Sequence, residues 1–235
     1  MTMATFKKST VREYFESIVI AVILALFVRT FVFQAFKIPT GSMENNLLIG
    51  DHLLVNKFVL GPAPTGLERV LLPVRPVRRG DVVVFKYPEE PERDFIKRVI
   101  GLPGDTLEVR NKKVYINGKA LEEPYVHVLE PPSVPSGFHE VTSFDVREHY
   151  GPVTVPDTQY FVMGDNRDNS QDSRYWGFLP RDYVKGRAMM VYWSYKADRE
   201  DYQDTDLAGG IRGFLSTFVH FFTRTRWDRM FHQIH

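Results

Sequence analysis

One apolar segment near the amino terminus constrains the chain more than any other feature. From Ile18 to Phe36 nearly every residue is apolar, and Arg29 is the exception. A helix of about 20 residues at 1.5 Å per residue matches a hydrocarbon core of roughly 30 Å. Arg29 lies past the midpoint, where its side chain can reach the far interface. We therefore predict a single transmembrane helix over residues 18–36.

Basic residues before this segment predict its orientation. Lys7, Lys8 and Arg12 precede it closely, and lysine and arginine are enriched on the cytoplasmic side of membrane helices. Residues 1–17 are then a cytoplasmic tail, and everything after Lys37 lies outside the cytoplasm at the plasma (inner) membrane. A cleaved signal peptide is the alternative, but no small-x-small site closes the run before Lys37.

The composition fits a folded domain and excludes several kinds of site. The 235 residues are 43% hydrophobic and 14% aromatic, which is enough for a packed core. Cysteine is absent, which excludes disulfides, thiolate metal sites and a cysteine nucleophile. A formal net charge of +1 lacks the basic excess typical of nucleic-acid-binding proteins, so we expect no nucleic-acid partner.

Short β-like segments follow the apolar run. Apolar stretches bounded by Gly, Pro or Asp predict strands that include residues 53–55, 82–85, 95–100, 107–110, 114–116, 160–163 and 188–193. Asn117-Gly118 adds a strong turn signal, which favours a hairpin region. We predict a mainly β fold, with an antiparallel sheet domain in two parts, 37–106 and 159–198. An inserted β-rich subdomain occupies residues 107–158.

The carboxyl-terminal region, residues 199–235, combines a linker with a predicted amphipathic helix. Apolar residues recur at helical spacing, and basic residues follow them. These are Ile211, Phe214, Leu215, Phe218 and Phe222, then Arg224, Arg226 and Arg229. Residues 211–222 would span only about 18 Å as a helix, too short to cross a bilayer. A helix lying at the interface and a terminal core helix both remain open.

The stretch Ile38-Pro39-Thr40-Gly41-Ser42-Met43 comes directly after the apolar run. Pro39 fixes one backbone dihedral and Gly41 relaxes another, so the chain can bend sharply and present the Ser42 hydroxyl to a cleft. From Phe36 to Ser42 the chain reaches at most about 20 Å. We interpret Ser42 as a nucleophile held at a membrane surface, and a plain turn is the alternative.

A nucleophilic serine needs a base. None of the seven histidines sits in a recognisable setting, and no zinc-type spacing of histidines appears, so we expect neither a Ser-His-Asp triad nor a metal site. Strand alternation places Phe95, Lys97 and Val99 on one face, and burial there disfavours the charged form of the lysine. We predict Lys97 as the base. A lysine that reaches solvent from a surface strand is the alternative.

A second polar cluster runs from Gly164 to Gly177 and is dense in Asp, Asn, Arg and Ser. It fails as a calcium loop, because a start at Asp165 puts Arg167 in a ligand position. We predict a rigid loop of paired carboxylates and guanidiniums that orients a hydroxyl such as Ser170 toward a neighbouring amine. A scaffold with no catalytic member is the alternative.

Several separated segments together resemble the bacterial type I signal peptidases, a family of serine/lysine proteases. The matching blocks are 38–43, 79–85, 97–105 and 164–177, in the family's order and spacing. The resemblance runs from Ile18 to Trp193 and is weak through residues 119–158. It implies an enzyme that removes signal peptides from secreted preproteins after small-x-small sites, with signal peptides and the lipid bilayer as partners and without cofactor or metal.

The resemblance also implies roles for individual residues. Ser42 corresponds to the nucleophile and Lys97 to the general base. Thr40 matches a position whose hydroxyl helps to hold the oxyanion, and Ser170 matches the residue that orients Lys97. The sheet domain is then the catalytic domain.

Supporting and substrate-binding residues follow from the same resemblance. Asp172 and Arg174 match a supporting pair. Other positions match those that shape shallow pockets for small substrate side chains: Phe36, Ile38, Met43, Leu47, Val84 and Ile96.

One departure from the family pattern follows the serine. The family usually has Met-x-Pro-Thr-Leu there, whereas this chain has Met43-Glu44-Asn45-Asn46-Leu47. The missing proline makes the turn beyond the nucleophile uncertain, and it motivates the alternative of a family member that has lost activity. A further alternative from another class is an anchored extracytoplasmic β-domain that binds a partner without catalysis.

Overall fold

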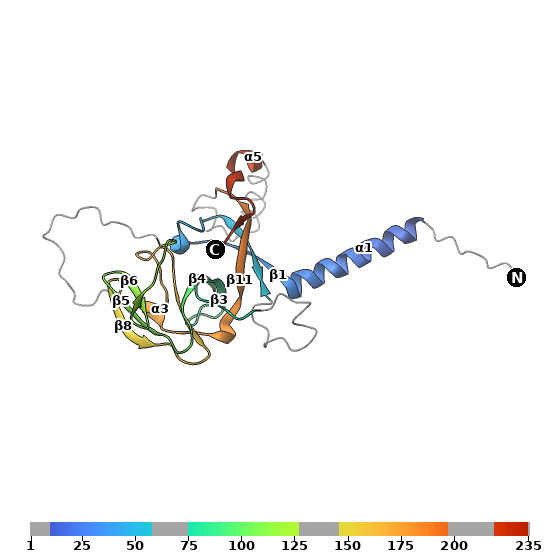
Figure 1. Ribbon diagram of the computed structural model, residues 1–235. Coiled ribbons are helices and arrows are strands. Elements are labelled where there is room, and N and C mark those ends of the chain that lie inside the picture. The colour runs from blue at the N-terminus through green and yellow to red at the C-terminus, as the bar shows by residue number, and fades with distance from the viewer. Residues whose placement is uncertain (1–9, 58–74, 127–145, 197–218, 235) are drawn as a thin grey trace.

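The computed structural model describes residues 10–57, 75–126, 146–196 and 219–234, and this part of the chain is mainly β (Figure 1). An eight-stranded sheet and a four-stranded sheet account for its strands, and neighbouring strands in both pair in antiparallel fashion. The predicted fold class, mainly β with antiparallel sheets, is therefore confirmed.

The main sheet has the strand order β1-β2-β11-β3-β4-β9-β10, and β12 pairs with β11. The strands are β1 (Phe33–Lys37), β2 (Asp51–Asn56), β3 (Val82–Lys86), β4 (Asp94–Gly101), β9 (Gln159–Met163), β10 (Leu179–Pro180), β11 (Val184–Ser194) and β12 (His232–Gln233). Five segments predicted from apolar patterning fall on β2, β3, β4, β9 and β11. Strands distant in sequence, such as β2 and β11, thus become neighbours.

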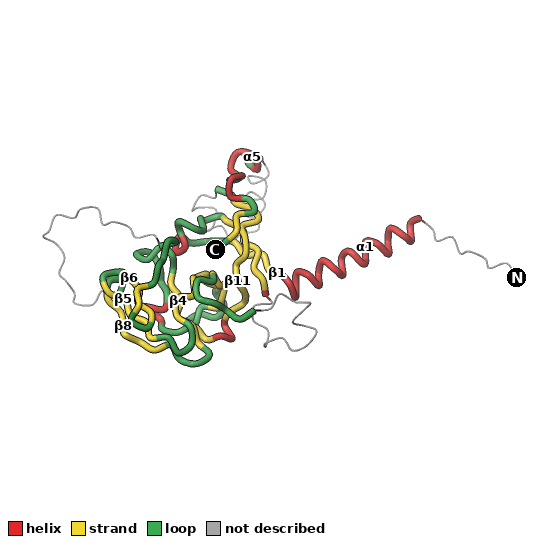
Figure 2. The backbone as a smooth tube through the Cα atoms, in the orientation of Figure 1, coloured by secondary structure: helices red, strands yellow, loops and turns green. Residues whose placement is uncertain are grey.

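The second sheet has the order β7-β6-β5-β8 and lies at the end of the molecule opposite α1 (Figure 2). Its strands are β5 (Thr106–Arg110), β6 (Lys113–Ile116), β7 (Lys119–Ala120) and β8 (His149–Thr154). Asn117 and Gly118 have φ values of 50° and 77°, which suit the tight turn that their sequence predicts. A hairpin therefore forms where the sequence predicts one.

Apolar side chains form three buried clusters that the sheets organise. Alternate residues of β3 point into two of them, with Val82 and Val84 in one and Val83 and Phe85 in the other. Such alternation follows from the pleat of a strand. The third cluster joins β4 and β9 to the second sheet. The central strands β3 and β4 are thus buried on both faces, and they form a rigid base for the site.

The structure of the amino-terminal region differs from the single helix predicted over residues 18–36. The α-helix α1 spans Thr10–Phe27, a π-helical turn covers Val28–Val32, and the chain then enters β1. An apolar run fits a helix or a buried strand equally well, and pairing of β1 with β2 decides for a strand. Among the described residues, no helix combines the length and the apolar composition needed to cross a membrane.

The carboxyl-terminal region also differs from the prediction. Residues 211–218 of the predicted amphipathic helix lie outside the described residues. The described part contains only a four-residue helix, α5 (Phe221–Arg224), followed by a 3₁₀ helix (Trp227–Arg229) and β12. The chain turns back because β12 finds a pairing partner in β11. Two further short helices, α3 (Ser173–Trp176) and a 3₁₀ helix (Arg181–Tyr183), flank β10.

Candidate active site

Ser42 lies in a single 3₁₀ turn, Gly41–Met43, shortly after β1. The extended backbone of Thr40 leads into this turn, and the amide of Glu44 closes it on the carbonyl of Gly41 at 3.0 Å. The side chain of Ser42 is largely buried, at 8% exposure. The sharp bend predicted from Pro39 and Gly41 is therefore present, and it directs the serine inward.

Lys97, on β4, reaches this serine across the interior. Its Nζ lies 2.7 Å from Ser42 Oγ and 3.0 Å from the carbonyl oxygen of Ile96. The ring of Phe95 lies beside it, with its centroid 5.2 Å from Nζ. Lys97 is only 3% exposed, so the predicted burial on the Phe95 face of the strand is observed. The predicted nucleophile and the predicted base are therefore in direct contact.

Burial changes the protonation of Lys97. Desolvation disfavours the ammonium and lowers the pKa of Lys97 to about 8, against an ordinary value of 10.5. The charges of Asp172 and Asp165 oppose this shift. In the described part of the chain, Lys97 makes no ion pair with a carboxylate. About one tenth of the amine is therefore neutral at pH 7, and only the neutral amine can accept a proton.

The loop after β9 forms a buried scaffold behind the serine. Asp172 accepts hydrogen bonds from the amide of Gly164 at 3.0 Å and from Nε and Nη2 of Arg174 at 2.9 Å each. It also caps α3 by accepting from the amide of Arg174. Arg174 in turn donates to the carbonyl of Arg167 at 2.8 Å. The two residues predicted as a pair therefore hold the loop's backbone in place.

A second buried ion pair lies on the other face of β4. Arg98 donates through Nε and Nη2 to the two oxygens of Asp165, at 2.8 and 2.7 Å. The guanidinium also donates to the carbonyl of Gly80 and lies over the ring of Tyr125, 3.9 Å from its centroid. Asn46 donates from Nδ2 to Asp165 at 2.7 Å. The nucleophile turn is thus tied to the polar loop.

Ser170 lies close to the serine turn but does not contact the base through a hydrogen bond. A Cβ on Gly164 would come 2.3 Å from Ser170 Oγ and 2.5 Å from the carbonyl oxygen of Ser42. Only glycine therefore fits between the two residues. The hydroxyl of Ser170 is buried and has no hydrogen-bond partner in the described part of the chain. Its role toward Lys97 stays a prediction.

A pocket of about 460 Å³ opens beside Ser42 and Lys97. Thr40 is exposed and lines it. The remaining lining residues come from β1, the serine turn, β4 and the polar loop: Phe36, Pro39, Gly41, Arg93, Asp94, Phe95, Ile96, Asn169 and Gln171. The pocket is large enough for several residues of an extended peptide.

The predicted substrate-pocket residues divide into two groups. Phe36 and Ile96 line the pocket. The others lie in the hydrophobic cluster on which the pocket rests, each at most 2% exposed: Ile38, Met43, Leu47 and Val84. The structure therefore brings all six together, four of them as the core beneath the pocket.

The backbone conformation of Asn45 is compatible with the departure from the family pattern after the serine. It has a φ of 98°, a conformation that asparagine tolerates and proline cannot adopt. The turn is closed by the amide of Leu47, which donates to the carbonyl of Met43 at 2.9 Å. The turn beyond the nucleophile is therefore well formed without the proline.

The sequence patterns do not by themselves indicate structural roles for Arg98, Asp165 and Asn46. Alternation along β4 places Arg98 on the face opposite Lys97, and a buried arginine requires a carboxylate partner. The sequence therefore indicates that Arg98 has a carboxylate partner, but it does not identify which carboxylate this is. Among the described residues, no group of three or more His, Asp or Glu side chains is arranged to hold a metal ion.

Comparison with known proteins places this geometry in a family. The family model described as signal peptidase, peptidase S26, matches residues 11–193. "Probable signal peptidase I-2" of Synechocystis is 41% identical over 191 residues, covering 79% of this chain and 75% of that protein.

Two further relatives carry similar names. Signal peptidase I of Pseudomonas aeruginosa is 37% identical, over 80% of this chain and 75% of that protein. Signal peptidase I S of Bacillus subtilis is 36% identical, over 83% of this chain and 95% of that protein. These matches show that the chain belongs to the S26 family of signal peptidases.

Proposed function

We propose that the chain cleaves preproteins through a Ser42/Lys97 dyad. Neutral Lys97 Nζ takes the proton of Ser42 Oγ as this oxygen attacks the scissile carbonyl carbon. The resulting ammonium then donates its proton to the leaving amine, which leaves an ester on Ser42. Lys97 next removes a proton from a water molecule that attacks the ester carbonyl, and it returns this proton to Ser42 Oγ as the ester bond breaks and the acid product leaves. The contact of 2.7 Å between Nζ and Oγ is the observation that carries this proposal.

The tetrahedral intermediate needs hydrogen-bond donors for its oxyanion. We assign this role to the amide of Ser42 and the hydroxyl of Thr40, which borders the pocket beside the serine. Ser170 is assigned to orient Lys97 when substrate is bound, because its buried hydroxyl is adjacent to the serine turn and has no other partner within the described residues. Asp172 and Arg174 are assigned to support these roles, because they hold the backbone of the polar loop in place.

The substrate is proposed to be the end of a signal peptide with a small-x-small site such as Ala-x-Ala. Phe36 and Ile96 contribute apolar surface to the pocket beside the dyad. The packed core beneath them limits its depth, since Ile38, Met43 and Val84 are fully buried. Shallow apolar subsites favour small side chains.

We also propose that the chain is anchored in the plasma (inner) membrane by a single amino-terminal crossing, with the catalytic domain outside the cytoplasm. α1 extends away from the sheets (Figure 1) and buries none of its residues. Its apolar side chains from Ile18 to Phe27 are largely exposed, which is costly in water. Lys7, Lys8 and Arg12 precede them, which favours a cytoplasmic amino terminus.

Cleavage of a preprotein with an Ala-x-Ala site by the full chain in detergent tests the dyad. We expect Ser42→Ala and Lys97→Met each to lower kcat by at least about 10³-fold, because each removes a participant in every turnover. Both variants should keep the wild-type circular dichroism spectrum. Substantial cleavage by either folded variant would reject the assignment and would favour a non-catalytic binding domain.

A further inference from the structure

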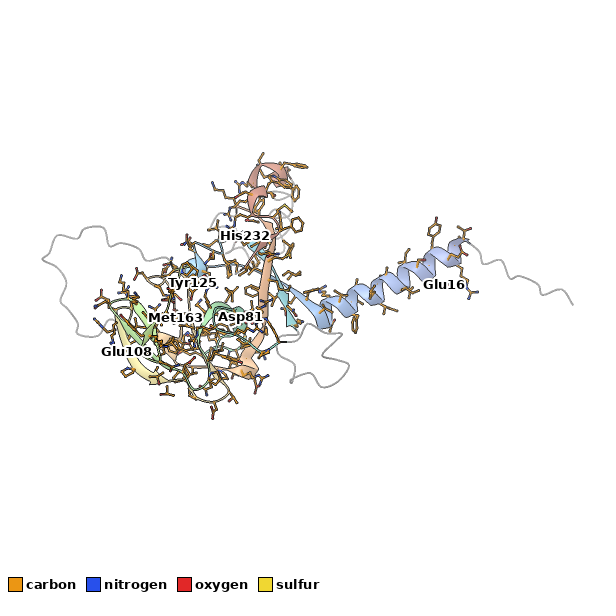
Figure 3. All side chains as sticks on the ribbon, in the orientation of Figure 1. Glu16, Asp81, Glu108, Tyr125, Met163 and His232 are labelled. Carbon is orange, nitrogen blue, oxygen red and sulfur yellow. The ribbon has the colours of Figure 1, made fainter. Side chains whose placement is uncertain are left out.

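The segment formed by residues 225–234 docks beside the nucleophile turn, and we call it the carboxyl-terminal segment. The amide of Arg226 donates to the carbonyl of Ser194 at 2.9 Å, and the amide of Ile234 donates to the carbonyl of Met189 at 2.9 Å. His232 belongs to β12, which pairs with β11, and it lies on the side of the molecule away from Glu108 of the second sheet (Figure 3). The segment is therefore an integral part of the catalytic domain.

A fully buried carboxylate, Asp51, anchors this segment. Arg229 donates to it through Nη2 at 2.7 Å and through Nε at 3.3 Å. Ser194 Oγ and the amide of Leu48 also donate to it, at 2.6 and 2.8 Å. Because an ionised carboxylate without partners is costly to bury, Asp51 binds the arginine strongly. Arg229 itself is 14% exposed, so its position is well defined.

Arg229 makes a second contact, and it is with the nucleophile turn. The same Nη2 donates to the carbonyl of Asn46 at 2.7 Å. Asn46 follows Ser42 by four positions, and the intervening turn is closed by the bond from Leu47 to Met43. The guanidinium thus connects the buried carboxylate at the start of β2 to the turn that carries the serine.

Asn46 is held from two sides. Its carbonyl accepts from Arg229, while its side chain donates to Asp165 at 2.7 Å. Ile234 of the carboxyl-terminal segment also packs against the cluster that contains Met43 and Leu47. The turn after the serine therefore has a polar anchor and an apolar anchor in a segment nearly two hundred residues later in the chain.

We propose that Arg229 is a positioning residue for the reaction: through Asn46 and Asp51 it fixes the turn that places Ser42 Oγ against Lys97. The inference rests on the proposed function of the dyad. Arg229 acts only through the backbone, since it touches neither Ser42 nor Lys97. A displacement of about 1 Å between reacting groups lowers a rate by up to about 10²-fold, so a loosened turn slows the chemical step.

The kinetic test compares Arg229→Ala with Arg226→Ala in the full chain in detergent. Arg226 is the matched control because it lies on the same segment and near the same carboxylate, 3.7 Å from Asp51, yet bonds to Ile49 and Ser194 and not to Asn46. Assays run well below the melting temperature of each variant, on a preprotein with an Ala-x-Ala site.

We expect Arg229→Ala to lower kcat by about tenfold or more with KM within about twofold, because the pocket is intact and the reacting atoms are misplaced. Arg229→Lys should recover part of kcat, since it keeps a charge for Asp51 and loses the fork that reaches Asn46. A kcat for folded Arg229→Ala within about twofold of that for Arg226→Ala would overturn the proposal.

A second measurement does not depend on activity. Hydrogen exchange of the amides in residues 43–48 should become faster in Arg229→Ala and stay near the wild-type rate in Arg226→Ala, because only the first loses the bond to the turn. Equal exchange in both variants would contradict the role of Arg229. If wild type and Ser42→Ala cleave alike, the dyad fails instead, and the exchange data still test the contact.

Discussion

Lys97 and Arg98 are adjacent on β4 and lie on opposite faces of this strand, where their buried side chains have very different surroundings. Arg98 is 1% exposed and has both oxygens of Asp165, a carbonyl and an aromatic ring around it. Lys97 is 3% exposed and has a neutral hydroxyl and a carbonyl. On one face a buried ion pair holds the structure together, while on the other face burial lowers the pKa of the amine, so that it can accept a proton more readily.

The difference shows how one strand can supply both rigidity and reactivity. An arginine remains protonated even when buried, so it demands a carboxylate. A lysine responds to the same burial by losing its proton more easily. Asp165 and Asp172 lie near enough to oppose the fall in the pKa of Lys97 without pairing with it. The site therefore depends on keeping carboxylates engaged with arginines and away from the lysine.

The largest effect is expected from breaking the pair on the arginine face. Arg98→Met leaves Asp165 buried with Asn46 as its remaining side-chain partner, and we expect the free energy of unfolding to fall by about 3–5 kcal/mol. Urea denaturation measures it. Arg98→Met/Asp165→Asn should be more stable than Arg98→Met alone, because no unpaired charge is left. Additive losses in this cycle would argue against a coupled ion pair.

The pH dependence of cleavage tests the lysine face. With a pKa of about 8 for Lys97, kcat/KM should rise with pH through about 8 and should be about 50-fold lower at pH 6 than at pH 8. A flat profile between these values would contradict a lysine base.

The titration of Lys97 should also make the free energy of unfolding depend on pH. Because the folded pKa of about 8 lies below the ordinary 10.5, the folded state binds fewer protons than the unfolded state between these values. Lys97 therefore destabilises the fold at low pH, and this cost is relieved as the pH rises from about 8 to 10.5. Lys97→Met should lack the rise. If the free energy of unfolding changed with pH by the same amount in both proteins, the shift would be excluded.

The smallest effect concerns the ring beside the amine. Phe95 lies 5.2 Å from Lys97 Nζ, where a cation–π contact favours the charged form by about 0.5–1 kcal/mol. Phe95→Leu should therefore move the midpoint of the kcat/KM profile about 0.4–0.7 pH units lower. Tyr87→Leu is the control, since Tyr87 stacks on Phe95 and its loss keeps the Phe95 ring beside Nζ, so the midpoint should stay unchanged. A higher midpoint in Phe95→Leu would reject the contact.

The sequence predicted the individual residues and turns of the site better than the contacts between them. Alternation along 95–99 placed Lys97 among apolar side chains, and Pro39 and Gly41 predicted the bend at Ser42. The apolar run did not show where helix α1 ends and β1 begins, because both environments accept the same residues. The departure at Asn45 and Asn46 suggested a defect, whereas the backbone conformation of Asn45 accommodates it.

Local patterns in this chain determined most of the strands, the tight turns and the candidates for the residues that carry the chemistry. These depend on the covalent geometry of neighbouring residues, which repeats every two positions in a strand. Tertiary structure alone decided that Lys97 meets Ser42 across 55 positions, that Arg98 pairs with Asp165 and that Arg229 returns to Asn46. Such contacts arise where distant strands pair and buried charges find partners, and local periodicity carries no information about them.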